Sequence, residues 1–126
     1  MLIEDYFARI EHSINDCPFV VHYECTKDKR SLHLGIIEGR VTFIDDSGLH
    51  FMEFIDVSKG IEKFKYSYHY ETRSNSLVFR YDMAPHFKGV ATFPHHKHEG
   101  NAVKESMAPS LRHVLSEIEE IIQSCQ

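Results

Sequence analysis

The feature that most constrains the fold of this chain is a regular alternation between positions 61 and 70. Glu62, Phe64, Tyr66, Tyr68 and Tyr70 alternate there with Ile61, Lys63, Lys65, Ser67 and His69. In a β-strand successive side chains point to opposite faces, so a period of two separates the two sets. The pattern predicts a strand with one aromatic and one polar face. We expect the three tyrosines to pack in the core or across strands.

Other strand-like runs flank this segment and are joined by short turns. Residues 41–44 and 49–57 surround Asp45-Asp46-Ser47-Gly48, which is typical of a hairpin because Gly tolerates positive φ. Residues 19–25, 32–37 and 77–81 supply further runs. Short turns join antiparallel neighbours, whereas parallel strands need long crossovers. The sequence therefore predicts an antiparallel meander of five or six strands.

Both ends of the chain have a helical pattern. Near the N-terminus, apolar residues recur every three or four positions between 2 and 14, and Pro18 follows. The last segment repeats the pattern from Leu111 to Ile122, after Pro109. We predict an α+β fold with the N- and C-terminal helices packed on one face of the meander, which leaves the opposite face as a candidate working surface.

Length and composition narrow the cellular context. A chain of 126 residues is expected to form a single domain, 1–126. Its three cysteines are odd in number and form no Cys-x-x-Cys pair, which is typical of reduced thiols in the cytosol. We find no signal-peptide pattern and no apolar run of the ~18 residues that span a bilayer. We therefore expect a cytoplasmic protein that does not enter membranes.

The charge is unevenly distributed. The formal net charge is −5, which argues against non-specific binding to nucleic acid. Residues 1–16 and 105–126 carry eight acids and only two arginines, whereas residues 17–104 carry 12 basic residues, 11 acids and eight of the ten histidines. An anionic ligand on the middle segment is therefore compatible with the charge pattern.

Residues 82–104 show little periodicity and are predicted to form a long loop, a feature that is usually functional in a small domain. It contains Thr92-Phe93-Pro94-His95-His96-Lys97-His98. Folding does not favour such a cluster, because turns prefer Gly, Pro, Asn or Asp and a core prefers apolar side chains. If the two ends of the loop close on each other, they form one patch from Arg80, Asp82, His86, His95, His96, Lys97 and His98. In an extended backbone, His96 and His98 project to one side, with His95 and Lys97 on the other.

This set of residues suits the cleavage of RNA without a metal ion. The reaction needs a base for the 2′-hydroxyl, an acid for the leaving 5′-oxygen and positive charge beside the phosphate. Histidine can transfer protons near neutral pH. We predict His86, His95, His96 and His98 as the catalytic candidates, with Arg80, Lys97 and Asp82 as substrate-binding residues.

Two other interpretations stay open. His96 and His98, with His86 or Asp82, could bind zinc or nickel, as in a metallohydrolase. Alternatively, the cluster is a solvated polar loop, whose histidines pair with carboxylates or stack on aromatics. We expect no native metal or other cofactor, because no His-Glu-x-x-His or cysteine pair supports one.

Arg80-Tyr81-Asp82-x-Ala84-Pro85-His86, followed by Thr92 to His98, resembles the TumE family of prokaryotic toxin-antitoxin proteins. The similarity extends to the length, the two helices and the meander. It implies a toxin, a helix-turn-helix antitoxin as partner, and an RNase architecture like that of RelE or barnase. Met83 and Phe87 depart from the family pattern, which often has Asn and His there, so both are left out of the site.

These inferences lead to one functional hypothesis and its alternatives. We predict a toxin that acts as a metal-independent endoribonuclease on RNA, although the acidity of the chain argues against a ribosome-dependent mechanism. The alternatives are a non-enzymatic protein that binds an antitoxin or cellular target through the same loop, and a metallohydrolase. A homodimer is compatible with the sequence.

Overall fold

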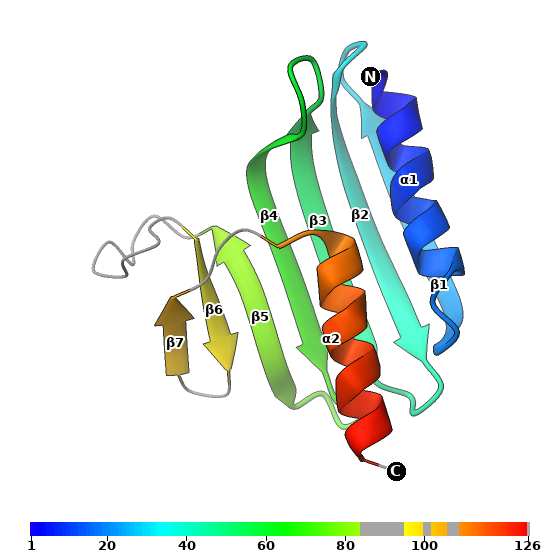
Figure 1. Cartoon of the computed structure of the whole chain (residues 1–126), viewed down its shortest axis with the longest axis vertical. Helices are drawn as coiled ribbons and strands as arrows, with labels where there is room; N and C mark the ends of the chain where they lie inside the picture. The colour runs from blue at the N-terminus through cyan, green and yellow to red at the C-terminus, as the bar shows by residue number, and fades with distance from the viewer. Residues whose placement is uncertain (84–94, 100–101, 106–108, 126) are drawn as a thin grey trace.

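The computed structural model describes residues 1–83, 95–99, 102–105 and 109–125 (Figure 1). The elements are α1 (Ile3–Asn15), β1 (Val20–Lys29), β2 (Leu34–Phe43), β3 (Gly48–Asp56), β4 (Glu62–Glu71), β5 (Leu77–Met83), β6 (His95–Glu99), β7 (Ala102–Glu105) and α2 (Leu111–Ser124). The strands form one antiparallel sheet in sequence order, from β1 to β7. The predicted α+β class and the antiparallel meander are thus confirmed.

Both helices lie on the same face of this sheet. Figure 1 shows α1 along β1 and β2, and α2 across the central strands. The buried side of α1 is apolar apart from the Tyr6 hydroxyl, and α2 buries a similar stripe from Leu111 to Ile122. Ser110 caps α2 by accepting a hydrogen bond from the backbone N–H of His113 at 3.1 Å. The other side of the sheet is therefore left uncovered by helices, and we call it the open face.

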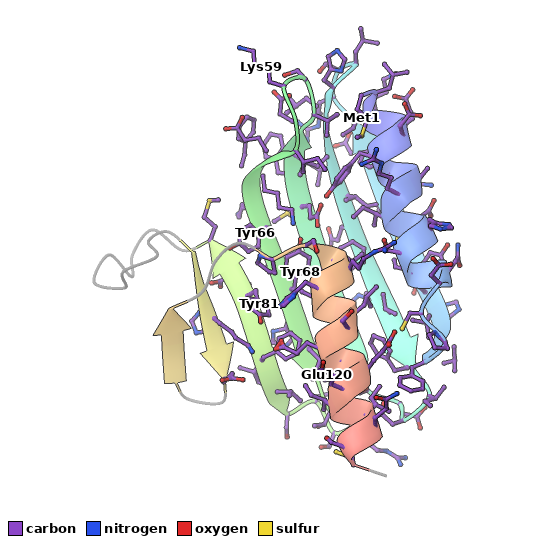
Figure 2. The ribbon with its side chains drawn as sticks, in the orientation of Figure 1. Met1, Lys59, Tyr66, Tyr68, Tyr81 and Glu120 are labelled. Atoms are coloured by element: carbon purple, nitrogen blue, oxygen red, sulfur yellow. The ribbon has the colours of Figure 1, made fainter. Side chains whose placement is uncertain are left out.

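The helix-covered face of the sheet forms the core. The buried hydrophobic side chains that its strands contribute are Ile37, Val41, Phe43, Leu49, Phe51, Ile55, Tyr66, Tyr68, Tyr70, Phe79 and Tyr81. Figure 2 shows three of these tyrosines, Tyr66, Tyr68 and Tyr81, on the face that the helices cover. The prediction that Tyr66, Tyr68 and Tyr70 are core residues is confirmed. Their rings are 2 % exposed or less, so they are not available for stacking on a ligand.

A glycine lets α1 approach the sheet closely. A Cβ atom at Gly35 would lie 2.8 Å from both Ile3 Cγ1 and Phe7 Cζ, and 3.0 Å from the backbone oxygen of Asp28. No real Cβ contact to a packed neighbour is this short, so only glycine fits under the helix here.

A β-bulge interrupts the alternation that the sequence shows in β4. Phe54 of β3 pairs with Lys65, but the next residue, Ile55, pairs with Lys63. Phe64 is therefore the extra residue, and the faces exchange on its N-terminal side. Lys63, predicted to lie on the polar face, is on the helix-covered face, and Phe64 lies on the open face against Phe54.

β6 and most of β7 fall within residues 82–104, which the sequence analysis predicted to form a loop. β6 consists of His-His-Lys-His-Glu, which has no apolar alternation because the strand lies toward the edge of the sheet, beyond the region that α2 covers (Figure 1). A strand in that position needs backbone partners but little apolar burial. Because β6 is polar, it lacks the apolar alternation by which the sequence analysis identified strands.

Candidate functional site

Charged and polar side chains gather on the open face of β4, β5 and β6. We call His69, Glu71, Arg80, Asp82 and His98 the open-face cluster. Arg80 lies opposite His69 of β4 on one side and opposite His98 of β6 on the other. Because paired residues share a face, the three strands place an imidazole, a guanidinium and a second imidazole in one row across the sheet.

Asp82 connects two members of this row. Arg80 Nε donates a hydrogen bond to Asp82 Oδ2 at 2.9 Å, and His98 Nε2 lies 3.4 Å from Asp82 Oδ1. The Asp82 side chain is 15 % exposed and His98 21 %, whereas Arg80 is 39 % exposed. The carboxylate thus lies beneath the guanidinium and the imidazole and orients them, and the guanidinium stays accessible to a ligand.

His69 is engaged through both ring nitrogens. Its Nδ1 is 3.4 Å from Arg80 Nη1, and its Nε2 is 3.1 Å from Glu71 Oε2. This arrangement supports the outer end of the Arg80 guanidinium.

The other predicted histidines differ in how far the structure describes them. Only the backbone of His95 and His96 is described: His96 pairs with Asp82 and His95 with Met83. His86 lies outside the described residues. The strand alternation that was predicted for residues 95–98 is consistent with this register.

Lys97 does not join Arg80, contrary to the expectation of a single patch. It pairs with Tyr81, one position out of phase with Arg80, and so lies on the opposite face of the sheet. Its Nζ donates to Glu117 Oε1 of α2 at 2.5 Å and lies 5.0 Å from the centroid of the Tyr81 ring. Burial lowers the pKa of Lys97, but hydrogen bonds to Glu117 and Tyr81 outweigh burial and the net shift is upward. Lys97 therefore attaches β6 to α2 as a fixed cation.

A second polar cluster lies on the helix-covered face and was missed by sequence reasoning. The Glu53 carboxylate of β3 is fully buried and accepts hydrogen bonds from the hydroxyls of Tyr6 and Tyr68. Lys63 Nζ lies 3.4 Å from Glu53 Oε2 and donates to Tyr68 Oη at 2.7 Å and to the Pro109 carbonyl at 2.6 Å. We call Glu53, Tyr6, Tyr68 and Lys63 the buried carboxylate cluster.

This cluster lies beside a groove between α1, the first residues of β4 and the start of α2. The groove has a volume of about 1140 Å³, and Tyr6 and Lys63 are among its lining residues, with Arg9 and Arg112. The sequence contained one signal for the buried carboxylate cluster: Glu53 is in phase with the apolar residues Leu49, Phe51 and Ile55 of the same strand. Lys63 could not be recognised as its partner, because the bulge at Phe64 moves Lys63 from the predicted polar face to the helix-covered face.

The buried carboxylate cluster predicts a loss of stability at alkaline pH. Burial raises the pKa of Tyr6 and of Tyr68, and the Glu53 carboxylate adds to both shifts. An unfolded tyrosine ionises near pH 10, so the stabilisation is complete below that pH and is lost above it. From pH 10 to 11 we expect the free energy of unfolding to fall by about 2 kcal/mol from these two groups. Urea titrations at each pH measure this fall in the free energy of unfolding. If Tyr6→Phe showed the same fall as the wild type, the assignment of the effect to Tyr6 would be wrong.

Within the described ranges, no group of three or more His, Cys, Asp or Glu side chains is placed to hold a metal ion. None of the helices in these ranges has the length and apolar character that crossing a membrane requires.

Comparison with known proteins yields a family. The family model described as Toxin TumE matches residues 10–123, which include the whole open-face cluster and nearly the whole chain. Neither the curated proteins nor the solved structures compared with the chain gave a match. Because this match covers most of its length, the chain belongs to the TumE family of toxins.

Proposed function

We propose that the protein is the toxin of a toxin-antitoxin pair and that it cleaves RNA without a metal ion at the open-face cluster. The observation that supports this most is the row formed by His69, Arg80 and His98, with Asp82 beneath it. A guanidinium held ready beside imidazoles provides the charge and the proton transfer that phosphodiester cleavage requires.

In the proposed reaction, the 2′-oxygen attacks phosphorus and the bond from phosphorus to the 5′-oxygen breaks. A base takes the 2′-hydroxyl proton and an acid gives a proton to the 5′-oxygen, leaving a 2′,3′-cyclic phosphate and a free 5′-hydroxyl. Arg80 holds the phosphate oxygens, and a guanidinium suits this because it can donate two parallel hydrogen bonds. His98 transfers one of the two protons.

The second proton-transfer group comes from His96, His95 or His86. His96 is favoured among the three because its backbone pairs with Asp82 and it lies two residues from His98 along β6. His69, which contacts both Arg80 and Glu71, is a positioning residue for the guanidinium.

The test is cleavage of a single-stranded RNA by purified protein in EDTA. We expect wild-type cleavage to persist under chelation and to yield cyclic phosphate ends. His98→Ala is expected to lower kcat by about 10²- to 10⁴-fold, the usual contribution of one proton-transfer group. His22→Ala is the matched control, since His22 is an exposed histidine of β1 at the far edge of the sheet, and it should keep full activity.

The alternatives give different results in the same assay. Activity that is lost in EDTA and restored by zinc would indicate a metallohydrolase. Toxicity in cells without any cleavage in vitro would indicate a protein that acts by binding its target. In either case the proposed mechanism is wrong.

The proposal includes a helix-turn-helix antitoxin that neutralises the toxin in the cytoplasm. Co-expression of such a partner, encoded beside the toxin, should restore growth to cells that produce the wild-type chain.

A further inference from the structure

An aromatic pair on the open face is not used by the proposed chemistry. Phe64, the extra residue of the bulge in β4, is 44 % exposed. Its ring meets that of Phe54 edge to face, with the centroids 5.6 Å apart and the planes at 83°. A large exposed aromatic side chain held in place by a second ring is a preformed surface for stacking.

The pair lies on the same face as the open-face cluster and in line with it. Lys65, which is exposed, pairs with Phe54 and is the next open-face residue of β4 toward His69. Lys65 and His69 are four residues apart along the strand, or about 13 Å at the usual rise per residue. A cation therefore separates the aromatic pair from Arg80, which lies beside His69.

The charges around the aromatic pair determine the direction in which a bound polyanion would run across the open face. Glu62 and Asp56 pair with each other at the end of the strands beyond Phe64, and the turn between the strands carries a single lysine, which leaves this end with a net negative charge. A phosphate backbone would be repelled at that end and attracted by Lys65 and Arg80 at the other. An extended polyanion with a base on Phe64 would therefore run toward the open-face cluster.

We propose that Phe64 and Phe54 form a base-stacking subsite for single-stranded RNA, whose backbone passes Lys65 to place a phosphate at Arg80. The subsite rests on the proposed function for its substrate. Exposed aromatic rings beside a line of cations are the usual means of binding single strands, because every unpaired base has a face to stack. Paired bases in a duplex are already stacked and cannot use such a surface.

The test measures binding separately from cleavage. A fluorescent single-stranded RNA with 2′-O-methyl groups cannot be cleaved, so its anisotropy reports affinity alone. We expect Phe64→Ala to weaken binding by about 5- to 150-fold, the loss of one stacked base. Phe64→Tyr should bind like the wild type. Ile44→Ala is the matched control, since Ile44 is 48 % exposed, in the turn after β2, and it should change nothing.

Each outcome supports or overturns the subsite. A duplex of the same sequence should compete poorly, and equal competition would overturn the proposal. So would equal affinity of Phe64→Ala and wild type, or no binding to wild type at all. Loss of antitoxin binding with unchanged RNA binding would identify the pair as a protein contact instead.

Cleavage assays keep this inference distinct from the proposed function. If cleavable RNA is processed, Phe64→Ala should raise KM and leave kcat unchanged. Normal cleavage with no effect of Phe64→Ala overturns the subsite alone. Binding that depends on Phe64, without any cleavage, overturns the ribonuclease mechanism and leaves a single-strand binding site.

Discussion

Replacing Arg80 by alanine is expected to lower kcat for RNA cleavage by about 10²- to 10³-fold, the usual cost of losing one preorganised donor to a developing anion. The guanidinium is held by Asp82 at 2.9 Å and by His69 at 3.4 Å, so it needs little reorganisation when charge develops on the phosphate. Single-turnover cleavage of a defined oligonucleotide in EDTA measures the effect.

Two further variants make this result specific to the site. Arg40 lies on the same face and in the same row, two strands from His69, and is exposed. Arg40→Ala changes the net charge equally and should keep activity within about twofold, since it is too far from the phosphate to act except through screened, long-range attraction. Arg80→Lys should recover only part of the loss, because an ammonium cannot contact Asp82 and His69 at once in the same geometry. Equal losses of activity in Arg40→Ala and Arg80→Ala would mean that only the overall electrostatic field of the protein matters.

Replacing Lys63 by methionine is expected to lower the free energy of unfolding by about 3–5 kcal/mol. Methionine fills a similar volume but leaves the buried Glu53 carboxylate without its cation. It also removes the donor to Tyr68 Oη and to the Pro109 carbonyl, which connects β4 to the start of α2. The loss would be a large part of the ~5–15 kcal/mol that stabilises a typical domain.

Urea unfolding at pH 7, followed by circular dichroism, measures this loss. Lys65→Met is the matched control, two residues along the same strand but exposed, and is expected to stay within about 0.5 kcal/mol of the wild type. Adding Glu53→Gln to Lys63→Met removes the uncompensated charge and should recover at least about 1 kcal/mol, since contacting residues are not additive. If Lys63→Met and Lys65→Met unfolded alike, the buried carboxylate cluster would not be a source of stability.

Much of the fold follows from local pattern. The apolar repeats near both ends predicted two helices, and the alternation and turns from 19 to 81 predicted the antiparallel strands. Such patterns are informative because one face of each element must be buried, so residue types reveal which face it is. β6 and β7 were not predicted because strands at the edge of a sheet need little apolar burial.

The candidate site was predictable only in part. The structure brings together Arg80, Asp82 and His98, which the sequence analysis selected, and their roles stay predictions. It adds His69 from β4 and separates Lys97 to the other face. No local pattern contains this information, since the face of Lys97 depends on its register with Tyr81 of β5.

The sequence by itself determined the two helices, the antiparallel order of the strands between 19 and 81 and the aromatic core face, because each is encoded by residues close together in the chain. Only the tertiary structure decided which charges meet. One inserted residue in β4 turns Lys63 inward to Glu53 and Phe64 outward to Phe54, and one step of register sends Lys97 to α2 instead of to Arg80. In a sheet, a shift of a single residue exchanges the two faces, and pairing between distant strands determines that shift.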